Sequence, residues 1–290
     1  MIPLIKLLSS LPLIVLYGLS NAAHFILSYI FPYRKKVIEA NLKNSFPEKS
    51  DKEIIKLRNK FYLYFTDIFF EFVKGYTLSK SQVLKRVQLI GDEEVKKYLS
   101  EGQPVILVAG HQGNWEWAIH RLALTNYTND IVYQKLSNKK FNDFTYQIRT
   151  RFKGINLLEK RESVLLTRER KDIPRAICLL ADQAPQKPES AYWTNFMNQE
   201  TAFFTGMERF AREYNYPVFY VELIREKRGY YQLKYELLVD TPFEAVPKGE
   251  IIEKFARKLE QSVKNYPDQY LWSHRRWKHQ KPSNINLKWD

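Results

Sequence analysis

The sequence has a single cysteine, Cys178, and few glycines, with 10 among its 290 residues. One cysteine excludes a disulfide-stabilised fold and any metal site built from several thiolates. Because Cys178 lies in the apolar run 177–180, we interpret it as a small core residue. The 10 Gly and 13 Pro follow no period, which excludes collagen-like and low-complexity chains. An apolar content of 44 % excludes a disordered chain, and the length suffices for a full hydrophobic core.

Acidic residues are also in deficit. The chain has 46 Lys and Arg against 32 Asp and Glu, a formal net charge of +14. Such an excess indicates an acidic partner: nucleic acid, anionic lipid or an acidic protein. Residues 134–175 hold half of it, with twelve basic residues against five acidic ones. No RNA- or DNA-binding motif accompanies these cations, so we expect no nucleic acid partner.

One segment, Leu7–Tyr33, lacks Asp, Glu, Lys and Arg altogether. Its 27 residues exceed the roughly 20 that a helix needs to cross a bilayer. The cationic triplet 34–36 follows at once and Lys6 stands alone before it, so the positive-inside rule places the rest of the chain in the cytoplasm. We predict a membrane anchor helix in residues 1–33 and a cytoplasmic domain in residues 34–290. An interfacial amphipathic helix and a cleaved signal peptide are the alternatives.

Apolar runs and helical periodicity alternate along the rest of the chain. Residues 34–75 predict two helices separated by residues 46–50. From residue 104 on, strands are predicted over Val105–Ala109, Ile131–Tyr133, Ile155–Leu158, Ala176–Leu180, Val218–Ile224 and Tyr231–Val239. Helices are predicted over residues 114–126, 140–152, 162–171, 203–214 and 248–265. This alternation is typical of an α/β fold with a mixed sheet flanked by helices. Ligands of such sheets bind beyond the carboxyl ends of the strands.

A histidine flanked by glycines follows the first of these strands. Gly110 and Gly113 allow a sharp turn around His111, and Glu116 comes five residues after the histidine. On a regular helix this spacing separates two side chains by ~140°, so they meet only if His111 lies in the turn and Glu116 at the start of the helix. Such a pair provides a general base, with the carboxylate orienting the imidazole. No Gly-x-Ser-x-Gly nucleophile motif is present, so we expect a substrate hydroxyl to be the nucleophile.

The motif Gly-His-x-Gly-Asn-Trp-Glu at residues 110–116 resembles that of the late lipid A acyltransferases of lauroyl or myristoyl type, within the glycerolipid acyltransferase superfamily. The resemblance extends over nearly the whole chain. Further matches are Phe31-Pro-Tyr-Arg-Lys-Lys-Val, Asn41-Leu, Ser45-Phe-Pro-Glu, Arg149-x-Arg151, Asp182-Gln183 and Pro267-x-Gln-Tyr-Leu-Trp-Ser-His-Arg-Arg-Trp-Lys. The wider superfamily often has Asp where this chain has Glu116, and the longer carboxylate can still reach the imidazole.

The resemblance implies transfer of a fatty acyl chain from an acyl-carrier-protein thioester to a hydroxyl of an anionic glycolipid, a lipid A precursor. It implies a bacterial inner membrane location with the catalytic domain on the cytoplasmic face, His111 and Glu116 as catalytic residues, and no cofactor or metal ion. Two alternatives remain open. One is an acyltransferase for another acceptor, such as an aminoacyl lipid or a lysophospholipid, and the other is a non-catalytic membrane-associated lipid-binding protein.

Five further residues are expected to bind substrate. Arg149 and Arg151 lie in the basic segment, and an arginine binds phosphate through two parallel hydrogen bonds. Asp182 and Gln183 end an apolar strand, where polar side chains face the ligand cleft of this architecture. Asn114 belongs to the histidine motif itself. In addition, His274, Arg275 and Arg276 form a cationic cluster that is either solvated or in contact with an anionic substrate.

Overall fold

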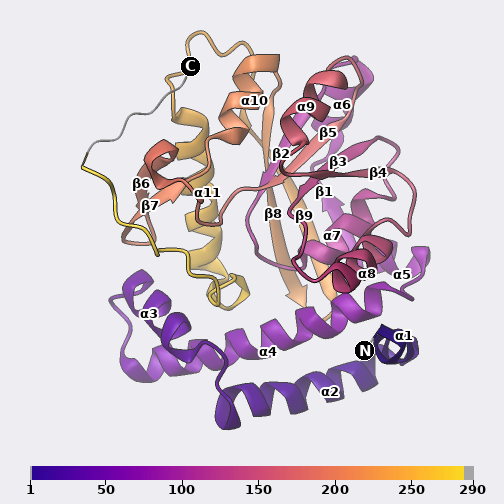
Figure 1. Cartoon of the computed structure of the whole chain (residues 1–290), viewed down its shortest axis with the longest axis vertical. Helices are drawn as coiled ribbons and strands as arrows, with labels where there is room; N and C mark the ends of the chain where they lie inside the picture. The colour runs from indigo at the N-terminus through magenta and orange to yellow at the C-terminus, as the bar shows by residue number, and fades with distance from the viewer. Residues whose placement is uncertain (1, 284–290) are drawn as a thin grey trace.

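The apolar runs assemble into one seven-stranded sheet in the computed structural model, which describes residues 2–283 (Figure 1). Its strands are β1 (Val87–Ile90), β2 (Val105–Ala109), β3 (Asn129–Tyr133), β4 (Ile155–Glu159), β5 (Ala176–Leu180), β8 (Val218–Lys227) and β9 (Tyr230–Val239). The strand order is β1-β9-β8-β2-β5-β3-β4, and all neighbours are parallel except β8 and β9. A separate antiparallel hairpin joins β6 (Tyr192–Phe196) to β7 (Gln199–Phe203).

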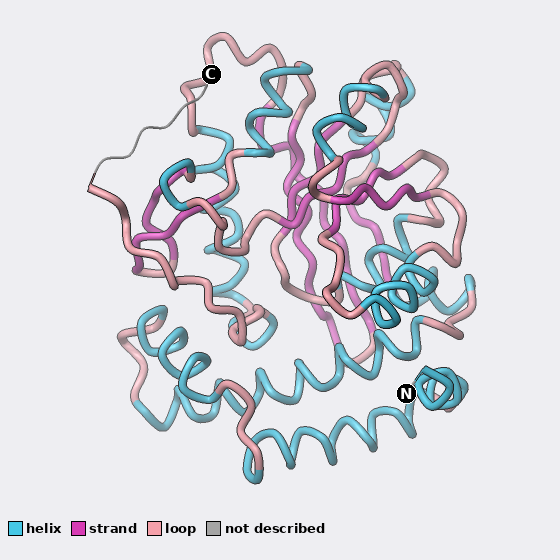
Figure 2. Tube along the Cα trace, viewed as in Figure 1, coloured by secondary structure: helices cyan, strands magenta, loops and turns pink. Residues whose placement is uncertain are grey.

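Helices cover both faces of the sheet, so the predicted mixed α/β fold is confirmed (Figure 2). The helices that follow the N-terminal segment are α3 (Lys35–Ser45), which packs on α4, and then α4 (Asp51–Gly75), α5 (Lys80–Arg86), α6 (Glu93–Ser100), α7 (Trp115–Leu122), α8 (Lys139–Arg149), α9 (Ser163–Glu169), α10 (Gly206–Tyr214) and α11 (Glu250–Asn265). Short 3₁₀ turns occur at Pro188–Ser190 and Pro267–Gln269. The end of the predicted cytoplasmic domain, residues 284–290, lies outside the described residues.

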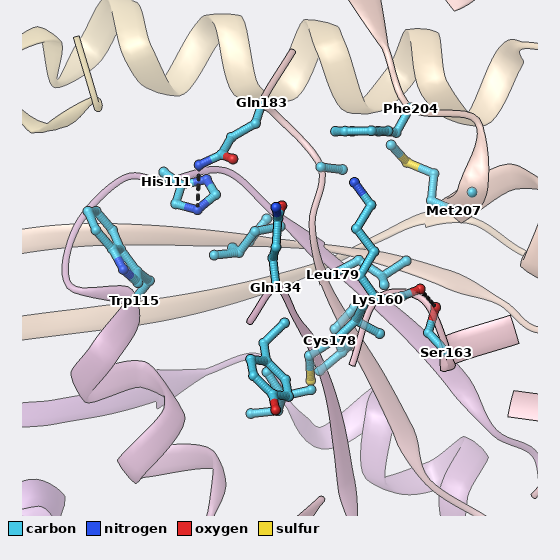
Figure 3. A pocket seen from close by; sticks show the side chains of 18 of the residues that line it. His111, Trp115, Gln134, Lys160, Ser163, Cys178, Leu179, Gln183, Phe204 and Met207 are labelled. Atoms are coloured by element: carbon cyan, nitrogen blue, oxygen red, sulfur yellow. Dashed lines mark hydrogen bonds between the residues drawn. The ribbon is translucent and has the colours of Figure 1, made fainter. Parts of the chain in front are cut away.

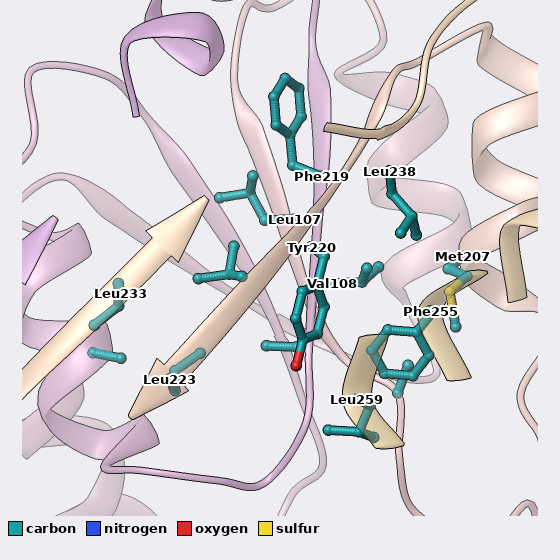
Figure 4. Packing of buried hydrophobic residues seen from close by; sticks show 14 of the residues in the cluster. Leu107, Val108, Met207, Phe219, Tyr220, Leu223, Leu233, Leu238, Phe255 and Leu259 are labelled. Carbon is teal, nitrogen blue, oxygen red and sulfur yellow. The ribbon is translucent and has the colours of Figure 1, made fainter. Parts of the chain in front are cut away.

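Alternation along the central strands divides the core into two layers (Figure 4). Leu107 and Phe219 lie on one side of the sheet, while Val108 and Tyr220 lie on the other, with Phe255 of α11. These side chains are almost fully buried, as expected for parallel strands that are covered on both faces. The sheet is therefore a rigid platform, and its strand ends fix the positions of the loops that follow them.

The apolar N-terminus is not the single helix predicted over Leu7–Tyr33. It consists of α1 (Ile2–Ser10), α2 (Leu13–Phe25) and a π-helical turn, η1 (Ile26–Ile30). The chain breaks between α1 and α2 because Pro12 has no amide hydrogen to donate and disfavours a helical conformation at the residue before it. The remaining stretch, Leu13–Ile30, is still long and apolar enough to cross a membrane, judged by length and composition alone.

Helix α2 runs beside α4 and is bonded to it (Figure 1). The hydroxyls of Tyr17 and Ser20 donate to the carboxylates of Glu71 and Asp67, at 2.7 and 2.6 Å. The opposite side of the segment is apolar and exposed, with 80 % of Ile14 accessible to solvent. The N-terminal segment is therefore fastened to the rest of the protein on one side and presents apolar side chains on the other.

The strand boundaries predicted from the sequence are accurate where the strands are buried on both faces. The bounds of β2 and β5 are those predicted, and β3, β4, β8 and β9 differ by one to three residues at an end. Strand β1 was not predicted, because it has four residues of which only Val87 is buried. The β6–β7 hairpin was also missed, since its strands combine polar and aromatic residues without a sustained apolar run.

Candidate active site

His111 lies in the loop after β2, beyond the carboxyl end of the strand, as the sequence predicted. Its Nδ1 is 2.6 Å from Oδ1 of Asp182, and its backbone N–H donates to Oδ2 of the same carboxylate at 2.9 Å. Asp182 follows β5, which pairs with β2 up to Ala109 and Leu180, so the sheet brings the two residues together. The histidine thus has a carboxylate partner that fixes both its ring and its backbone.

Asp182 is buried and charged. Burial raises its pKa, but the charge of His111 and the two hydrogen bonds from that residue outweigh this effect, and the pKa lies below its usual value. An ionised Asp182 accepts a hydrogen bond from Nδ1–H, which leaves Nε2 as the ring nitrogen that faces away from the carboxylate. The ring edge of Trp115, 5.3 Å between centroids, supports His111 from the side.

Two glycines make this turn possible. A Cβ atom on Gly110 would lie 2.6 Å from a methyl carbon of Leu259 in α11. Gly113 has φ +59°, and a Cβ atom there would lie 2.7 Å from the carbonyl oxygen of Leu223. Both distances are shorter than real contacts. At Gly113 the neighbour is backbone and φ is positive, so glycine is required there, whereas a side chain at Gly110 would need Leu259 to move.

The predicted pairing of His111 with Glu116 does not form, since both carboxylate oxygens of Glu116 bind another residue. Arg149, the last residue of α8, donates from Nε to Oε2 at 2.9 Å and from Nη2 to Oε1 at 2.6 Å. Burial raises the pKa of Glu116, but the Arg149 guanidinium more than offsets this effect and holds it below its usual value. Glu116 thus orients Arg149, and Asp182 has the position beside the imidazole.

A large pocket of about 970 Å³ opens beside His111. Arg149 and Gln183 also line it, and Nε2 of Gln183 lies 3.3 Å from Nε2 of His111 (Figure 3). Arg149 and Gln183, two of the five predicted binding residues, therefore line the same cavity as His111. Gln183 lies on the side of the imidazole that faces away from Asp182.

The pocket reaches both faces of the sheet because neighbouring strands separate there. Strand β3 pairs with β5 only as far as Ile131 and Cys178, whereas β5 stays paired with β2 to Leu180. The compartment beside α7 is apolar and is lined by Leu107, Ala118, Ile119, Leu122, Leu223 and Leu233. The compartment beside α9 and α10 is mixed, with Lys160, Ser163, Leu179, Phe204, Met207 and Arg209 (Figure 3). Cations at Lys135 and Lys278 extend the basic lining.

Two of the predicted substrate-binding residues make structural contacts. Arg151 donates from Nη1 to the carbonyl oxygens of Gly75 and Leu78 at 2.6 and 2.7 Å, which fastens the end of α4. Asn114 caps α7 by accepting from the backbone N–H of Trp117 at 2.9 Å. Cys178, interpreted from the sequence as a core residue, is half-buried and lines the pocket, and desolvation raises the pKa of its thiol, which stays protonated.

The three residues of the C-terminal cationic cluster differ in burial: Arg276 is buried, His274 is half-buried and Arg275 is exposed. They belong to the segment that follows α11, residues 266–279, which we call the C-terminal strap. His274 accepts a hydrogen bond at Nε2 from the backbone N–H of Ala184 at 3.2 Å, and burial lowers its pKa to about 4, so it is neutral. Arg276 lies over the ring of Phe203, 4.6 Å from its centroid.

The strap contacts the loop that carries His111. Tyr270 forms an isolated β-bridge with Gln112, the residue after the histidine. Nδ2 of Asn41 in α3 donates to the carbonyl oxygens of Trp272 and His274, at 2.8 and 3.0 Å. The loop that carries His111 is therefore enclosed by segments from both ends of the chain.

The sequence identified Asp182 but assigned it to substrate binding. Asp182 follows β5, and β5 lies next to β2 in the sheet, which is why Asp182 reaches the histidine. The strand order shows that β5 and β2 are neighbours, and the sequence alone does not. Lys160 lies in the basic segment and Lys278 ends the C-terminal motif, but no signal distinguished them, or Arg209, from the many other cations as lining residues. Within residues 2–283, no group of three or more His, Cys, Asp or Glu side chains is arranged to hold a metal ion.

Comparison with known proteins identifies relatives of this chain. A family model described as "Bacterial lipid A biosynthesis acyltransferase" matches residues 1–279. No curated protein sequence matches the chain. Among solved structures, the chain is similar to the crystal structure of the 1-acyl-sn-glycerophosphate (LPA) acyltransferase, PlsC, from Thermotoga maritima, with a TM-score of 0.39 and 13 % identity. That similarity covers 89 % of this chain and 97 % of the other.

Proposed function

This chain belongs to the bacterial lipid A biosynthesis acyltransferase family, and we propose that it moves a fatty acyl chain from an acyl-carrier-protein thioester to a hydroxyl of a lipid A precursor. The observation that carries the proposal is His111, backed by Asp182 and facing the pocket of about 970 Å³ with Nε2. A general base held in this way suits a reaction whose nucleophile is a hydroxyl of the substrate.

The reaction follows from the orientation of the imidazole. Nε2 of His111 removes the proton from the acceptor hydroxyl while the hydroxyl oxygen attacks the carbonyl carbon of the thioester. Ionised Asp182 stabilises the imidazolium that forms, through the 2.6 Å contact with Nδ1. The C–S bond then breaks, the ester is complete, and the imidazolium returns its proton to the leaving thiolate. Gln183, 3.3 Å from Nε2, marks where the hydroxyl would bind.

Arg149 provides positive charge in the same cavity. Its two hydrogen bonds to Glu116 fix the guanidinium at the pocket wall. We expect it to stabilise a negatively charged oxygen, on a substrate phosphate or on the tetrahedral intermediate. The predicted importance of Glu116 is kept in this form, as a positioning residue for Arg149.

The two compartments suit the two substrates. The apolar compartment beside α7 would hold a hydrocarbon chain, whose transfer from water into an apolar environment contributes about 0.8 kcal/mol per CH₂. The compartment beside α9 and α10 contains Lys160 and Arg209, which suit the phosphorylated sugars of a lipid A precursor or the phosphopantetheine of a carrier protein. His111 lies where an acyl group from one side can meet a hydroxyl from the other.

The N-terminal segment supports docking at a membrane surface. If α2 crossed the bilayer, α4 would have to enter with it, and α4 contains nine charged residues. We therefore propose that α1, α2 and η1 lie in the interfacial region of the leaflet, which was the second of the predicted arrangements. The exposed cations 34–36 at the end of the segment would bind anionic headgroups. Residues 34–290 would then carry the site on the cytoplasmic face, where the carrier protein is found.

The proposal is tested with purified protein, a labelled acyl-carrier-protein donor and a lipid A precursor. We expect His111→Ala and Asp182→Asn each to lower kcat about 10²–10⁴-fold while thermal unfolding stays cooperative. Because the two residues act as a unit, the double variant should lose little more than either single variant. Near-native turnover in His111→Ala would refute the mechanism. Transfer to a lysophospholipid but not to the lipid A precursor would refute the proposed acceptor.

A further inference from the structure

A second buried carboxylate, Glu71 of α4, lies between α2 and the loop that carries His111, residues 110–114, which we call the catalytic loop. Glu71 is fully buried and accepts three side-chain hydrogen bonds. Tyr17 of α2 donates to Oε1 at 2.7 Å, Asn114 donates to Oε2 at 2.6 Å, and the hydroxyl of Tyr231 in β9 also donates to Oε2. Burial raises the pKa of Glu71 to about 7, while these three donors act against that rise.

The contact with Asn114 leads directly to the loop that carries His111. Asn114 ends that loop and caps α7, so its side chain is fixed between Glu71 and the N–H of Trp117. The indole Nε1 of Trp117 donates to the backbone carbonyl of Glu71 at 2.8 Å. About two turns earlier on α4, the hydroxyl of Tyr64 donates to the carbonyl oxygen of Gly113. Helix α4 therefore holds the far end of the catalytic loop at several points.

The contact with Tyr17 leads in the other direction, to the exposed apolar segment. The phenol ring of Tyr17 lies under the guanidinium of Arg228, 4.4 Å from the ring centroid. The hydroxyl of Tyr17 donates the hydrogen bond that joins α2 to Glu71. The hydroxyl of Ser20, one turn further along α2, donates to Asp67 instead. Two similar hydroxyls of one helix thus contact two carboxylates of α4, and the carboxylate bound by Tyr17 is the one that binds Asn114.

We propose that Glu71 is a positioning residue that joins the membrane-facing helix α2 to the catalytic loop, so that seating of α2 maintains the placement of His111. The inference rests on the proposed function of His111. A single carboxylate can serve both sides because its two oxygens accept from opposite elements, Oε1 from α2 and Oε2 from the loop. When one donor is removed, the buried carboxylate loses one of its three side-chain hydrogen bonds, and its remaining contacts relax.

The hydroxyl of Tyr17 can be removed with little other change. Tyr17→Phe keeps the ring and its stacking on Arg228, and Ser20→Ala is the matched control because it removes a hydroxyl of the same helix that binds Asp67. We expect Tyr17→Phe to lower kcat about 5- to 20-fold with KM changed less than about twofold. Ser20→Ala should lower the melting temperature to a similar extent and leave kcat within about twofold of wild type.

The carboxylate itself is tested with a conservative pair. In Glu71→Gln, the amide oxygen can accept from Asn114 and Tyr231, and the amide nitrogen can donate to the Tyr17 hydroxyl, so most of kcat should remain. Glu71→Leu leaves Asn114 without an acceptor and should lose activity further, if it folds. The proposal is overturned if Tyr17→Phe and Ser20→Ala have equal kcat, or if Glu71→Gln loses as much kcat as His111→Ala. Since His111→Ala is measured in parallel, an active His111→Ala would instead refute the proposed function.

Discussion

The Glu116→Gln substitution tests which of two carboxylates, Glu116 or Asp182, acts as the partner of His111. The substitution removes the charge that pairs with Arg149 and keeps the side-chain shape. Loss of one partner from a buried ion pair costs about 3–5 kcal/mol. Because 18 % of the Arg149 side chain is exposed and can be rehydrated, we expect a smaller loss, of about 1–3 kcal/mol. The effect on kcat should be about 10-fold or less, far below that of Asp182→Asn.

The assay combines thermal unfolding with turnover. The single variants Glu116→Gln and Arg149→Gln should each unfold several degrees below wild type, since about 1 kcal/mol corresponds to ~2–4 °C in a domain of this size. The double variant should recover part of this loss, because no unpaired charge is left buried. A double variant whose destabilisation equals the sum of the single ones would show that the pair contributes nothing.

The pH dependence has a definite sign. The folded-state pKa of Glu116 is lowered, so its contribution to stability is present above the unfolded value of about 4.3 and is lost as the pH falls through the lower, folded value. The difference in melting temperature between wild type and Glu116→Gln should therefore shrink below about pH 4. A Glu116→Gln variant that melts like wild type but loses kcat 10²-fold, with Asp182→Asn nearly active, would refute this assignment and restore Glu116 as the catalytic partner.

Two further predictions concern the pocket and the membrane surface. Ala118→Phe should narrow the apolar compartment and raise the ratio of rates with short-chain over long-chain acyl-carrier donors; an unchanged ratio would place the hydrocarbon chain elsewhere. Ile14→Asp should weaken binding to anionic phospholipid vesicles in a flotation assay, whereas Ile173→Asp, another exposed isoleucine outside the N-terminal segment, should bind like wild type. Equal binding by both variants would exclude α2 as the docking surface.

The sequence predicted the sheet and the position of the histidine well because both depend on local signals. Strands buried on both faces form continuous apolar runs, and β2 with its Gly-His turn is such a run followed by two glycines. The family resemblance, confirmed over residues 1–279, came from motifs of the same local kind. Local patterns of this type are preserved on folding because tertiary packing uses them directly.

The partner of the histidine could not be predicted in the same way. Glu116 is five residues from His111 and Asp182 is 71 residues away, yet the sheet places Asp182 at the imidazole. Sequence spacing ranks nearby residues first, whereas parallel strand pairing joins residues that are distant along the chain. The same reason applies to the C-terminal cations, whose surroundings the sequence left open: His274 and Arg276 make contacts with segments more than 70 residues away, which local charge density does not reveal.

The C-terminal strap has a consequence for the order in which the protein matures during synthesis. Asn41 binds carbonyl oxygens at positions 272 and 274, 231 and 233 residues later, and Tyr270 bridges to the residue after the histidine. Domains generally fold from the N-terminus during synthesis, so α3 and the loop that carries His111 are made well before the strap that packs against them. The turn around His111 therefore gains these contacts only once residues 270–274 have been synthesised, late in the folding of this domain.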